Sequence, residues 1–457
     1  PNPNAPVITA GGATSICIGD AVTLFSDAAD SYLWNTGATT ASISVTAAGT
    51  YSVTNYNSFN CGTTSAGITI AVNDPLADFT GTPTLVFIPN AVTSFSANTT
   101  GFAPYNYLWE FGDGGTSVSA TPTHTYNLVA FNTVSLTVTD NTGCSKMLVK
   151  PNYIQVEQLF PSTGMTTGTS LNISGVSFQD PEIGVITLAD GNCGISVDSG
   201  KVFTPLPTGN TEPLTGVCAL PGKWVAIGKN GTIIHSINNG ANWNPIVSGT
   251  TEDFNAIHCA TPTSGHIVGK NGAIHKFTGS AVTTETSGTT EHLNGIYEFA
   301  NGNAYAVGDN QTLLSYNGAA WTPQTSPINF NIKDVRFSDA LNGYVVGANG
   351  NILQTTNGGS SWAPSLTGVD VDFNSIDVAG TDTAWATGSG GIVYKTVDNG
   401  SNWVRYSVGY TDDQSQLRVT KGGKGHIVGQ NGNGRYFNDS FPTRRSSDQI
   451  GRASCRE

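Results

Sequence analysis

The chain has 457 residues, enough for roughly two to four domains. Only 11% of the residues are charged, and the formal net charge of −13 argues against binding to nucleic acid or an anionic membrane surface, because both require basic patches. The sequence has no continuous apolar run of about 18 residues, so it predicts no membrane span. Short runs of Val, Ile, Thr, Tyr and Trp alternate with Gly, Asn and Asp, a pattern that predicts an all-β protein.

Residues 1–73 are expected to form a small β-sandwich. Short runs rich in apolar residues are separated by turn residues, and they cover 21–25, 32–34, 42–45 and 49–53. Strands of this length with frequent turns are what two packed sheets require. Segment 31–53 resembles the immunoglobulin-like modules of bacterial adhesins and gliding-associated surface proteins, in which Trp34 and Tyr51 would be core residues.

Cysteine is sparse, with seven residues in the chain. None of them forms a CxxC or Cys/His cluster with the spacing of metal ligands, so we expect no metal and no cofactor. Cys17 and Cys61 flank the first sandwich and could pair across it in an oxidising compartment. The alternative is two unpaired cysteines that act as small hydrophobic residues.

A second sandwich is expected over residues 76–153, after a linker at 73–75. Its central run, 107–114, reads YLWEFGDG and contains Trp109, Phe111, Asp113 and Gly114. Trp109 and Phe111 would point to one face of a strand, and Asp113-Gly114 would supply a hairpin turn. Asp113 could instead contact calcium or a ligand, but a lone Asp-Gly is explained by the turn.

The same run resembles the hallmark of the PKD (polycystic kidney disease) domain, WDFGDG followed by HxY. The later residues of the motif are His124 and Tyr126. Glu110 stands where the family usually has Asp. The resemblance implies a β-sandwich module with a structural role for these residues.

Residues 154–440 contain a repeat that predicts a β-propeller. The repeat is anchored by glycines separated by 39 or 41 residues: Gly228, Gly269, Gly308, Gly347, Gly388 and Gly429. A weaker copy lies around Leu188, so the sequence contains six to seven repeats and predicts seven blades. Each unit contains an Asn-Gly hairpin between apolar runs or a close variant of it, and about 40 residues suit one four-stranded blade.

A second motif of the form S/T-x-D/N-x-G-x-x-W/F recurs in phase with these glycines. Its central residues are Asp198, Asn238, Asn357 and Asp398, together with Asn317 in a copy that is one residue shorter. The motif resembles the Asp-box, or bacterial neuraminidase repeat, which implies a structural turn in which the Asp or Asn side chain bonds backbone amides. Residues 342–362 also resemble the repeat of the photosystem II assembly-factor propeller family.

Both ends of the repeat region carry further expectations. Residues 155–163 look like the outer strand of a blade, so we expect them to complete the last blade and close the ring. Residues 441–457 resemble two translated short-read sequencing adapters, and we interpret them as an artefact. The chain opens on Pro1 without Met, which suggests an internal fragment of a longer protein.

Catalytic motifs are not evident in the sequence. A sialidase needs three arginines that converge on a carboxylate, and the propeller region has four arginines without that context. Other glycosidases need only a carboxylate pair, which the sequence leaves open. The face formed by the Asn-Gly hairpins and the connections between blades is the candidate binding face, and its charged residues are Lys229, Glu252, Asp253, Lys270, Glu291, His292, Asp309, Asp370 and Asp372.

These patterns favour a non-enzymatic, secreted or cell-surface binding or adhesion protein. The two sandwiches would act as spacers or adhesive modules, and the propeller would bind a protein or glycan. Similar architectures carry a C-terminal sorting domain for type IX secretion. The alternative is a carbohydrate-active hydrolase, a glycosidase or less favourably a sialidase, with a PKD accessory domain.

Overall fold

The computed structural model describes residues 4–279, 281–369, 371–420 and 423–438, and it is an all-β structure. The chain divides into two compact units between Gln158 and Leu159. Candidate residue Asp370 and the adapter-like segment 441–457 lie outside the described residues. Among the described residues, no helix is long and apolar enough to span a membrane.

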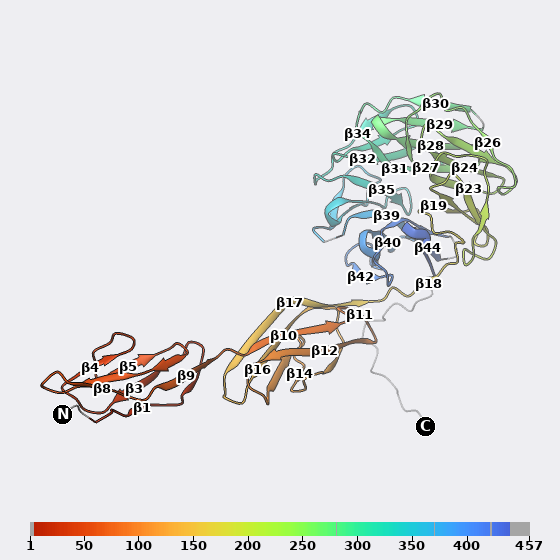
Figure 1. Cartoon of the computed structure of the whole chain (residues 1–457). Coiled ribbons are helices and arrows are strands. Elements are labelled where there is room, and N and C mark those ends of the chain that lie inside the picture. Colours follow the sequence, from red (N-terminus) through yellow and green to blue (C-terminus); the bar gives the residue numbers. More distant parts are fainter. Residues whose placement is uncertain (1–3, 280, 370, 421–422, 439–457) are drawn as a thin grey trace, which may run out of the picture. The chain divides into compact units, whose positions relative to one another are not determined.

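The first module of the N-terminal unit consists of short strands (Figure 1). Its core contains Trp34 and Tyr51. One sheet has the order β1 (Ile8–Ala10), β3 (Val22–Ser26) and β5 (Ser42–Val45). The next has the order β2 (Ser15–Cys17), β9 (Ile68–Asn73) and β6 (Gly49–Tyr51). The last has the order β4 (Ser31–Trp34), β7 (Val53–Tyr56) and β8 (Gly62–Thr64).

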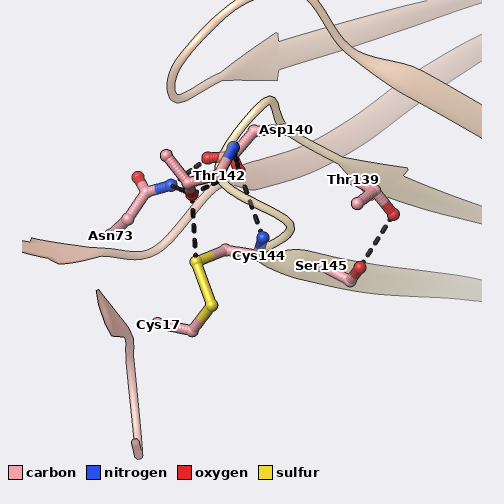
Figure 2. The surroundings of a disulfide bond; sticks show 7 residues. All are labelled: Cys17, Asn73, Thr139, Asp140, Thr142, Cys144 and Ser145. Atoms are coloured by element: carbon pink, nitrogen blue, oxygen red, sulfur yellow. Dashed lines mark hydrogen bonds between the residues drawn. A yellow bond between two sulfur atoms is a disulfide. The ribbon is translucent and has the colours of Figure 1, made fainter. Parts of the chain in front are cut away.

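The predicted disulfide between Cys17 and Cys61 is wrong. Cys17 is bonded to Cys144 of the second module (Figure 2), with the two Cα atoms 5.3 Å apart. Cys61 is free. The reason is topological: Cys17 ends β2 beside Asn73 of β9, whereas Cys61 lies between β7 and β8 in another sheet. A second disulfide joins Cys218 to Cys259.

The second module packs two sheets face to face. The smaller sheet has the order β10 (Leu76–Thr82), β12 (Ala91–Thr100) and β15 (Thr123–Tyr126). The larger has the order β11 (Leu85–Ile88), β17 (Ser145–Gln158), β16 (Ala130–Thr139), β13 (Asn106–Glu110) and β14 (Thr116–Ser117). Their inward-facing residues form one core, in which Trp109 and Phe111 are fully buried.

The C-terminal unit is a β-propeller, and the part of it that the structure describes has seven four-stranded blades (Figure 1). The strand order in each blade runs from the innermost to the outermost strand. Blade 1 is β19 (Ile173–Phe178), β20 (Gly184–Leu188), β21 (Cys193–Ser196) and β22 (Thr204–Leu206). Blade 2 is β23 (Leu214–Leu220), β24 (Lys223–Gly228), β25 (Ile233–Ser236) and β26 (Asn244–Pro245). Blade 3 is β27 (Phe254–Thr261), β28 (Ser264–Gly269), β29 (Ile274–Thr278) and β30 (Ala281–Glu285).

The remaining blades follow the same order. Blade 4 is β31 (Leu293–Glu298), β32 (Ala304–Gly308), β33 (Leu313–Tyr316) and β34 (Trp321–Pro323). Blade 5 is β35 (Ile332–Phe337), β36 (Gly343–Gly347), β37 (Asn351–Thr355) and β38 (Ala363–Leu366). Blade 6 is β39 (Phe373–Ala379), β40 (Thr383–Gly388), β41 (Ile392–Thr396) and β42 (Val404–Ser407). Blade 7 is β43 (Gln414–Val419), β44 (Lys424–Gly429), β45 (Gly434–Asn438) and β18 (Thr163–Gly164).

Blade 7 therefore takes its outer strand from the start of the propeller, but later in the chain than expected. Residues 155–158 belong to β17 of the second module, where they pair with β11. The closing strand is β18, which pairs with β45, and Phe160 donates a backbone hydrogen bond to Ser407 of blade 6. The expected closing strand at 155–163 is corrected to Thr163–Gly164, because the sheet of the second module already pairs the earlier residues.

Candidate functional site

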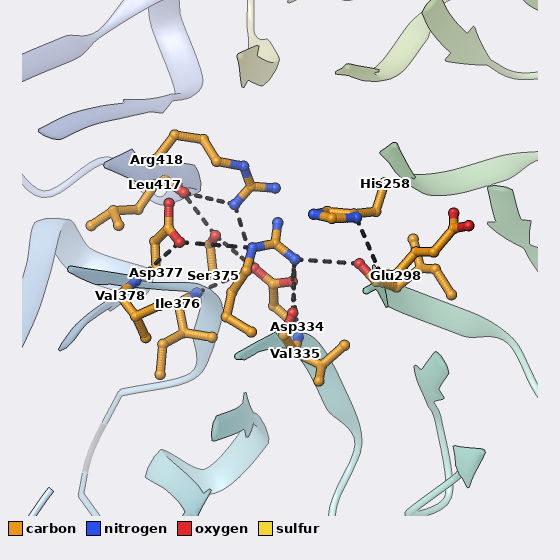
Figure 3. Close-up of polar contacts among 12 residues, drawn as sticks. His258, Glu298, Asp334, Val335, Ser375, Ile376, Asp377, Val378, Leu417 and Arg418 are labelled. Carbon is orange, nitrogen blue, oxygen red and sulfur yellow. Dashed lines mark hydrogen bonds and ion pairs between the residues drawn. The ribbon is translucent and has the colours of Figure 1, made fainter. Parts of the chain in front are cut away.

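A polar cavity of about 80 Å³ lies at the centre of the propeller. It is lined by residues near the start of the innermost strands of all seven described blades, including Ser174, Thr215, Asn255, Asn294, Lys333, Asn374 and Ser415. Figure 3 shows the side chains of Asp334, Asp377 and Arg418 gathered in this region, with His258 across from them. The innermost strand of a blade is the free edge of its sheet, so its backbone groups need partners other than a neighbouring strand.

One layer of polar side chains supplies some of these partners. Each side chain donates a hydrogen bond to a backbone carbonyl on the inner strand of the next blade. The pairs are Ser174 with Leu214 (2.6 Å), Thr215 with Phe254 (2.7 Å), Asn255 with Leu293 (2.9 Å), Asn294 with Ile332 (3.0 Å) and Asn374 with Gln414 (2.9 Å).

A second layer of side chains accepts hydrogen bonds from backbone amides of the next inner strand. The acceptors are Ser177 (from Ala219, 2.9 Å), His258 (from Glu298, 3.1 Å), Asp334 (from Ile376, 3.2 Å), Ser375 (from Leu417, 3.2 Å), Asp377 (from Val419, 2.7 Å) and Gln416 (from Val176, 2.6 Å). We call the contact between two neighbouring inner strands a seam. The described propeller has seven seams, and each is bridged by a hydrogen bond of at least one of the two layers. A buried amide without a partner costs about 1–3 kcal/mol, so these residues stabilise the ring.

Charged residues are concentrated on the side of the cavity formed by blades 5 to 7. Arg336 lies 3.1 Å from Asp334 and 3.9 Å from Asp377, and Arg418 lies 3.8 Å from Asp334. Burial raises the pKa of the Asp377 carboxyl, although Arg418 and Arg336 oppose it. Burial, with a contribution from Arg336, lowers the pKa of Arg418 to about 10. Arg418 therefore remains a cation at neutral pH.

His258 is neutral, in keeping with its role as an acceptor. Burial, followed by the positive charges of Arg336 and Arg418, holds the pKa of His258 well below its ordinary value. Among the described residues that line the cavity, three are basic (Lys333, Arg336 and Arg418) and one, Asp334, is acidic. Carboxylates balance these cations, because Lys333 pairs with Asp309 at 3.5 Å and Arg336 with Asp377 at 3.9 Å.

The candidate binding face has a structural function that the sequence did not reveal. Four hairpins donate a backbone amide to a residue that precedes the inner strand of the next blade: Asn230 to Asp253 (3.1 Å), Asn271 to His292 (3.1 Å), Asn349 to Asp372 (2.8 Å) and Gly390 to Asp413 (3.1 Å). Asn310 and Asn431 make the same contact with Asn331 and Asn172. Asp253, His292 and Asp372 therefore fix the hairpins across the seams.

Most of the other predicted face residues form hydrogen bonds or ion pairs. Glu252 and Glu291 each accept a hydrogen bond of 2.8 Å from a hairpin asparagine side chain. Lys270 pairs with Asp253 at 2.7 Å, and Asp309 accepts a hydrogen bond from Asn294 at 2.8 Å. Lys229 is exposed. The structure does not bring this set together in one cleft, because its members are spread around the ring.

The Asp-box residues bond turn backbones. Their side-chain oxygens accept from amides at 2.8–3.0 Å, as in Asp198 with Lys201 and Val202, Asn238 with Asn242, Asn317 with Ala319 and Ala320, Asn357 with Ser361, and Asp398 with Asn402. In the second module, Asp113 accepts from the Gly115 amide at 3.0 Å and contacts His124 at 2.8 Å. Gly114 has a φ of +91° in that turn.

Sequence reasoning missed the charged cluster of the cavity. A signal was present, because Arg336, Asp377 and Arg418 follow one another at intervals of 41 residues, the spacing of the anchoring glycines in these blades. They occupy the same place on three consecutive inner strands. Their spacing indicated a shared layer around the propeller axis.

Comparisons with known proteins agree with this architecture. Residues 313–411 match the family described as photosynthesis system II assembly factor YCF48, and residues 72–156 match the PKD domain. The solved structure of YCF48 from Cyanidioschyzon merolae is 17% identical, with a TM-score of 0.52, over 61% of this chain and 98% of that chain. No curated protein matches the chain.

Two other solved propellers are also similar. YCF48 bound to D1 peptide is 16% identical, with a TM-score of 0.54, over 61% of this chain and 95% of that chain. The WD40 β-propeller domain of Doa1 is 11% identical, with a TM-score of 0.54, over 61% of this chain and 96% of that chain. At these identities the likeness establishes the fold.

Proposed function

We propose that this protein is a non-enzymatic binding protein, secreted or held at the cell surface, and that its propeller is a platform for a protein partner. The observation that carries the proposal is the polar cavity at the centre of the ring, whose lining includes three basic side chains, Lys333, Arg336 and Arg418. The structural neighbour YCF48 bound to D1 peptide gives the proposal support, because that propeller holds a peptide.

The partner would place an acidic side chain or a terminal carboxylate at the cavity. Lys333 is the most accessible of the three cations, with 36% of its side chain exposed, and Arg418 has 20% exposed. Arg336 is held by Asp334 and by the Val335 carbonyl at 2.7 Å, so it positions the cluster. A neutral glycan offers no charge to these cations, which makes an acidic peptide the better fit.

Secretion is supported by the two disulfides, because such bonds persist in oxidising compartments. The sandwiches would act as spacers or adhesive modules. A hydrolase is less well supported, because both oxygens of Asp334 already accept hydrogen bonds from Val335, Ser375 and Ile376. A catalytic carboxylate must be free to reach its substrate.

The test is binding of the full chain to an array of peptides sorted by net charge and by free or amidated C-terminus. We expect acidic peptides to bind best and Lys333→Glu to weaken them about tenfold, or about 1.4 kcal/mol. Lys229→Glu on the hairpin face is the matched control and should change affinity less. Preference for basic peptides, or equal binding by both variants, would overturn the proposal, and turnover of a fluorogenic glycoside would contradict its non-enzymatic part.

A further inference from the structure

The connection between the two N-terminal modules is two residues long, and residues of both modules contact each other beside it. Strand β9 ends at Asn73 and β10 begins at Leu76, so the linker is Asp74-Pro75. Cys17 pairs in register with Asn73, and the Ile18 amide donates to the Asn73 carbonyl at 2.9 Å. The cysteine of the first module is therefore fixed beside the linker.

Cys144 of the second module is also held in place by hydrogen bonds. It follows a tight turn that begins at Asp140, whose carboxylate accepts from the Thr142 amide at 2.9 Å and from the Cys144 amide at 3.1 Å. The Asn73 side chain reaches across the linker and donates to Asp140 and, at 3.0 Å, to Thr142 (Figure 2). Polar contacts and a disulfide thus meet at the same junction.

We propose that the Cys17–Cys144 bond is a covalent clasp that turns the two sandwiches into one rigid segment. A linker of two residues acts as a pivot by itself, because nothing else in the covalent chain fixes the direction of the second module. The clasp adds a second covalent connection, between two cysteines that are 127 positions apart in sequence. With two connections the modules can no longer rotate about the linker. Its effect is independent of what the propeller binds.

The clasp is also sensitive to redox conditions. A dithiol reductant would split the S–S bond, leave a thiol on Cys17 and on Cys144, and be oxidised to its own disulfide. The junction would then depend on the Asn73 contacts and on the exposed ion pair between Lys146 and Asp74, at 3.1 Å. An exposed pair contributes only about 0–1 kcal/mol, so the pivot would open more often.

The experiment uses the full chain in two steps. Non-reducing peptide mapping should recover a Cys17–Cys144 linked peptide. Limited digestion with a protease that cuts before Asp should then cleave at Asp74 about tenfold faster in Cys17→Ala and in Cys144→Ala than in the wild type, because the joint opens locally. Cys61→Ala removes a cysteine that is free in the structure and is the matched control, with the wild-type rate.

Three results would overturn the clasp. One is a linked peptide that contains Cys17 and Cys61, or no linked peptide that contains Cys17. Another is unchanged cleavage at Asp74 in both variants. The last is a rise in cleavage at Asp20 and Asp27 as well, because cutting inside the first sandwich would indicate its unfolding and not the opening of a joint.

Discussion

At the scale of single residues, two buried histidines of the propeller have different surroundings. His266 and His426 occupy the strand position that other blades fill with aromatic residues such as Tyr344 and Trp385, and both histidines are fully buried. His266 lies 3.3 Å from Glu285 and 3.1 Å from Glu298, with the rings of Tyr316 and Trp321 beside it. His426 stacks on Phe178 and contacts a backbone carbonyl.

The contribution of His266 to stability should decrease as pH rises. Burial alone would lower the pKa of His266, but the nearby carboxylates of Glu285 and Glu298 outweigh it and raise the pKa. A histidine with a raised folded-state pKa contributes stability that is complete below its unfolded value, about 6.5, and is lost as pH rises through the folded value. We therefore expect the difference in unfolding free energy between wild type and His266→Gln to shrink between pH 5.5 and 8.5, measured by urea denaturation.

His426 provides a control with the opposite sign. Burial, with a smaller contribution from Lys424, lowers the pKa of His426 to about 4. Its neutral form is favoured in the folded state, so stability is lost as pH falls from about 6.5 towards 4. The unfolding free energy of His426→Gln should therefore rise relative to that of the wild type as the pH is lowered. Parallel pH profiles for the two variants would contradict both assignments.

At the scale of elements, a hairpin glycine lets the loop that leaves the outer strand of its own blade approach the hairpin closely. Gly272 has a φ of +70°, and a Cβ atom there would lie 2.0 Å from the Thr289 carbonyl oxygen. Gly302 has a φ of +87°, with nothing within 4 Å of the same atom. The pair separates the cost of backbone conformation from the cost of the close approach.

Gly302→Ala should destabilise the propeller by about 1–2 kcal/mol, the cost of a left-handed conformation for a residue with a Cβ. Gly272→Ala should cost a further ~1–3 kcal/mol, because the hairpin and the loop that contains Thr289 must move apart. Guanidinium denaturation followed by tryptophan fluorescence measures the difference. If the two substitutions lowered the unfolding free energy equally, the hairpin would have space for a Cβ atom at Gly272, contrary to the structure.

These elements also show what sequence alone could predict. The glycine spacing predicted the blades because each anchoring glycine lies against a backbone carbonyl, where a Cβ atom would come within 1.9–2.4 Å of the oxygen. That Asp253 and His292 cap the hairpins of preceding blades could not be read from the sequence, since each contact joins residues about 20 positions apart on different blades. The partner of Cys17 was missed for the same reason: it lies 127 residues away in another module.

At the scale of the propeller, closure depends on a few residues outside the repeat. Phe160 is 3% exposed and packs against Phe437 and Tyr406, with ring centroids 4.8 and 5.6 Å apart. Phe160→Ala should destabilise the propeller by about 3–5 kcal/mol because it leaves a cavity between the outer strands of blades 6 and 7. Val247→Ala, at a side chain that is 87% exposed, should stay within about 0.5 kcal/mol of wild type. Similar unfolding midpoints for the two variants would show that the ring does not need this closure.

The hydrogen bonds across the seams also give the ring a direction. In the two polar layers a side chain of one blade forms a hydrogen bond with the backbone of the blade that follows it. The last of these bonds joins Gln416 of blade 7 to Val176 of blade 1. A blade copied in tandem would therefore bring the partner that its successor needs. The repeat can change in number by duplication without leaving an unmatched edge, whereas a repeat inserted in reverse order of strands would leave two.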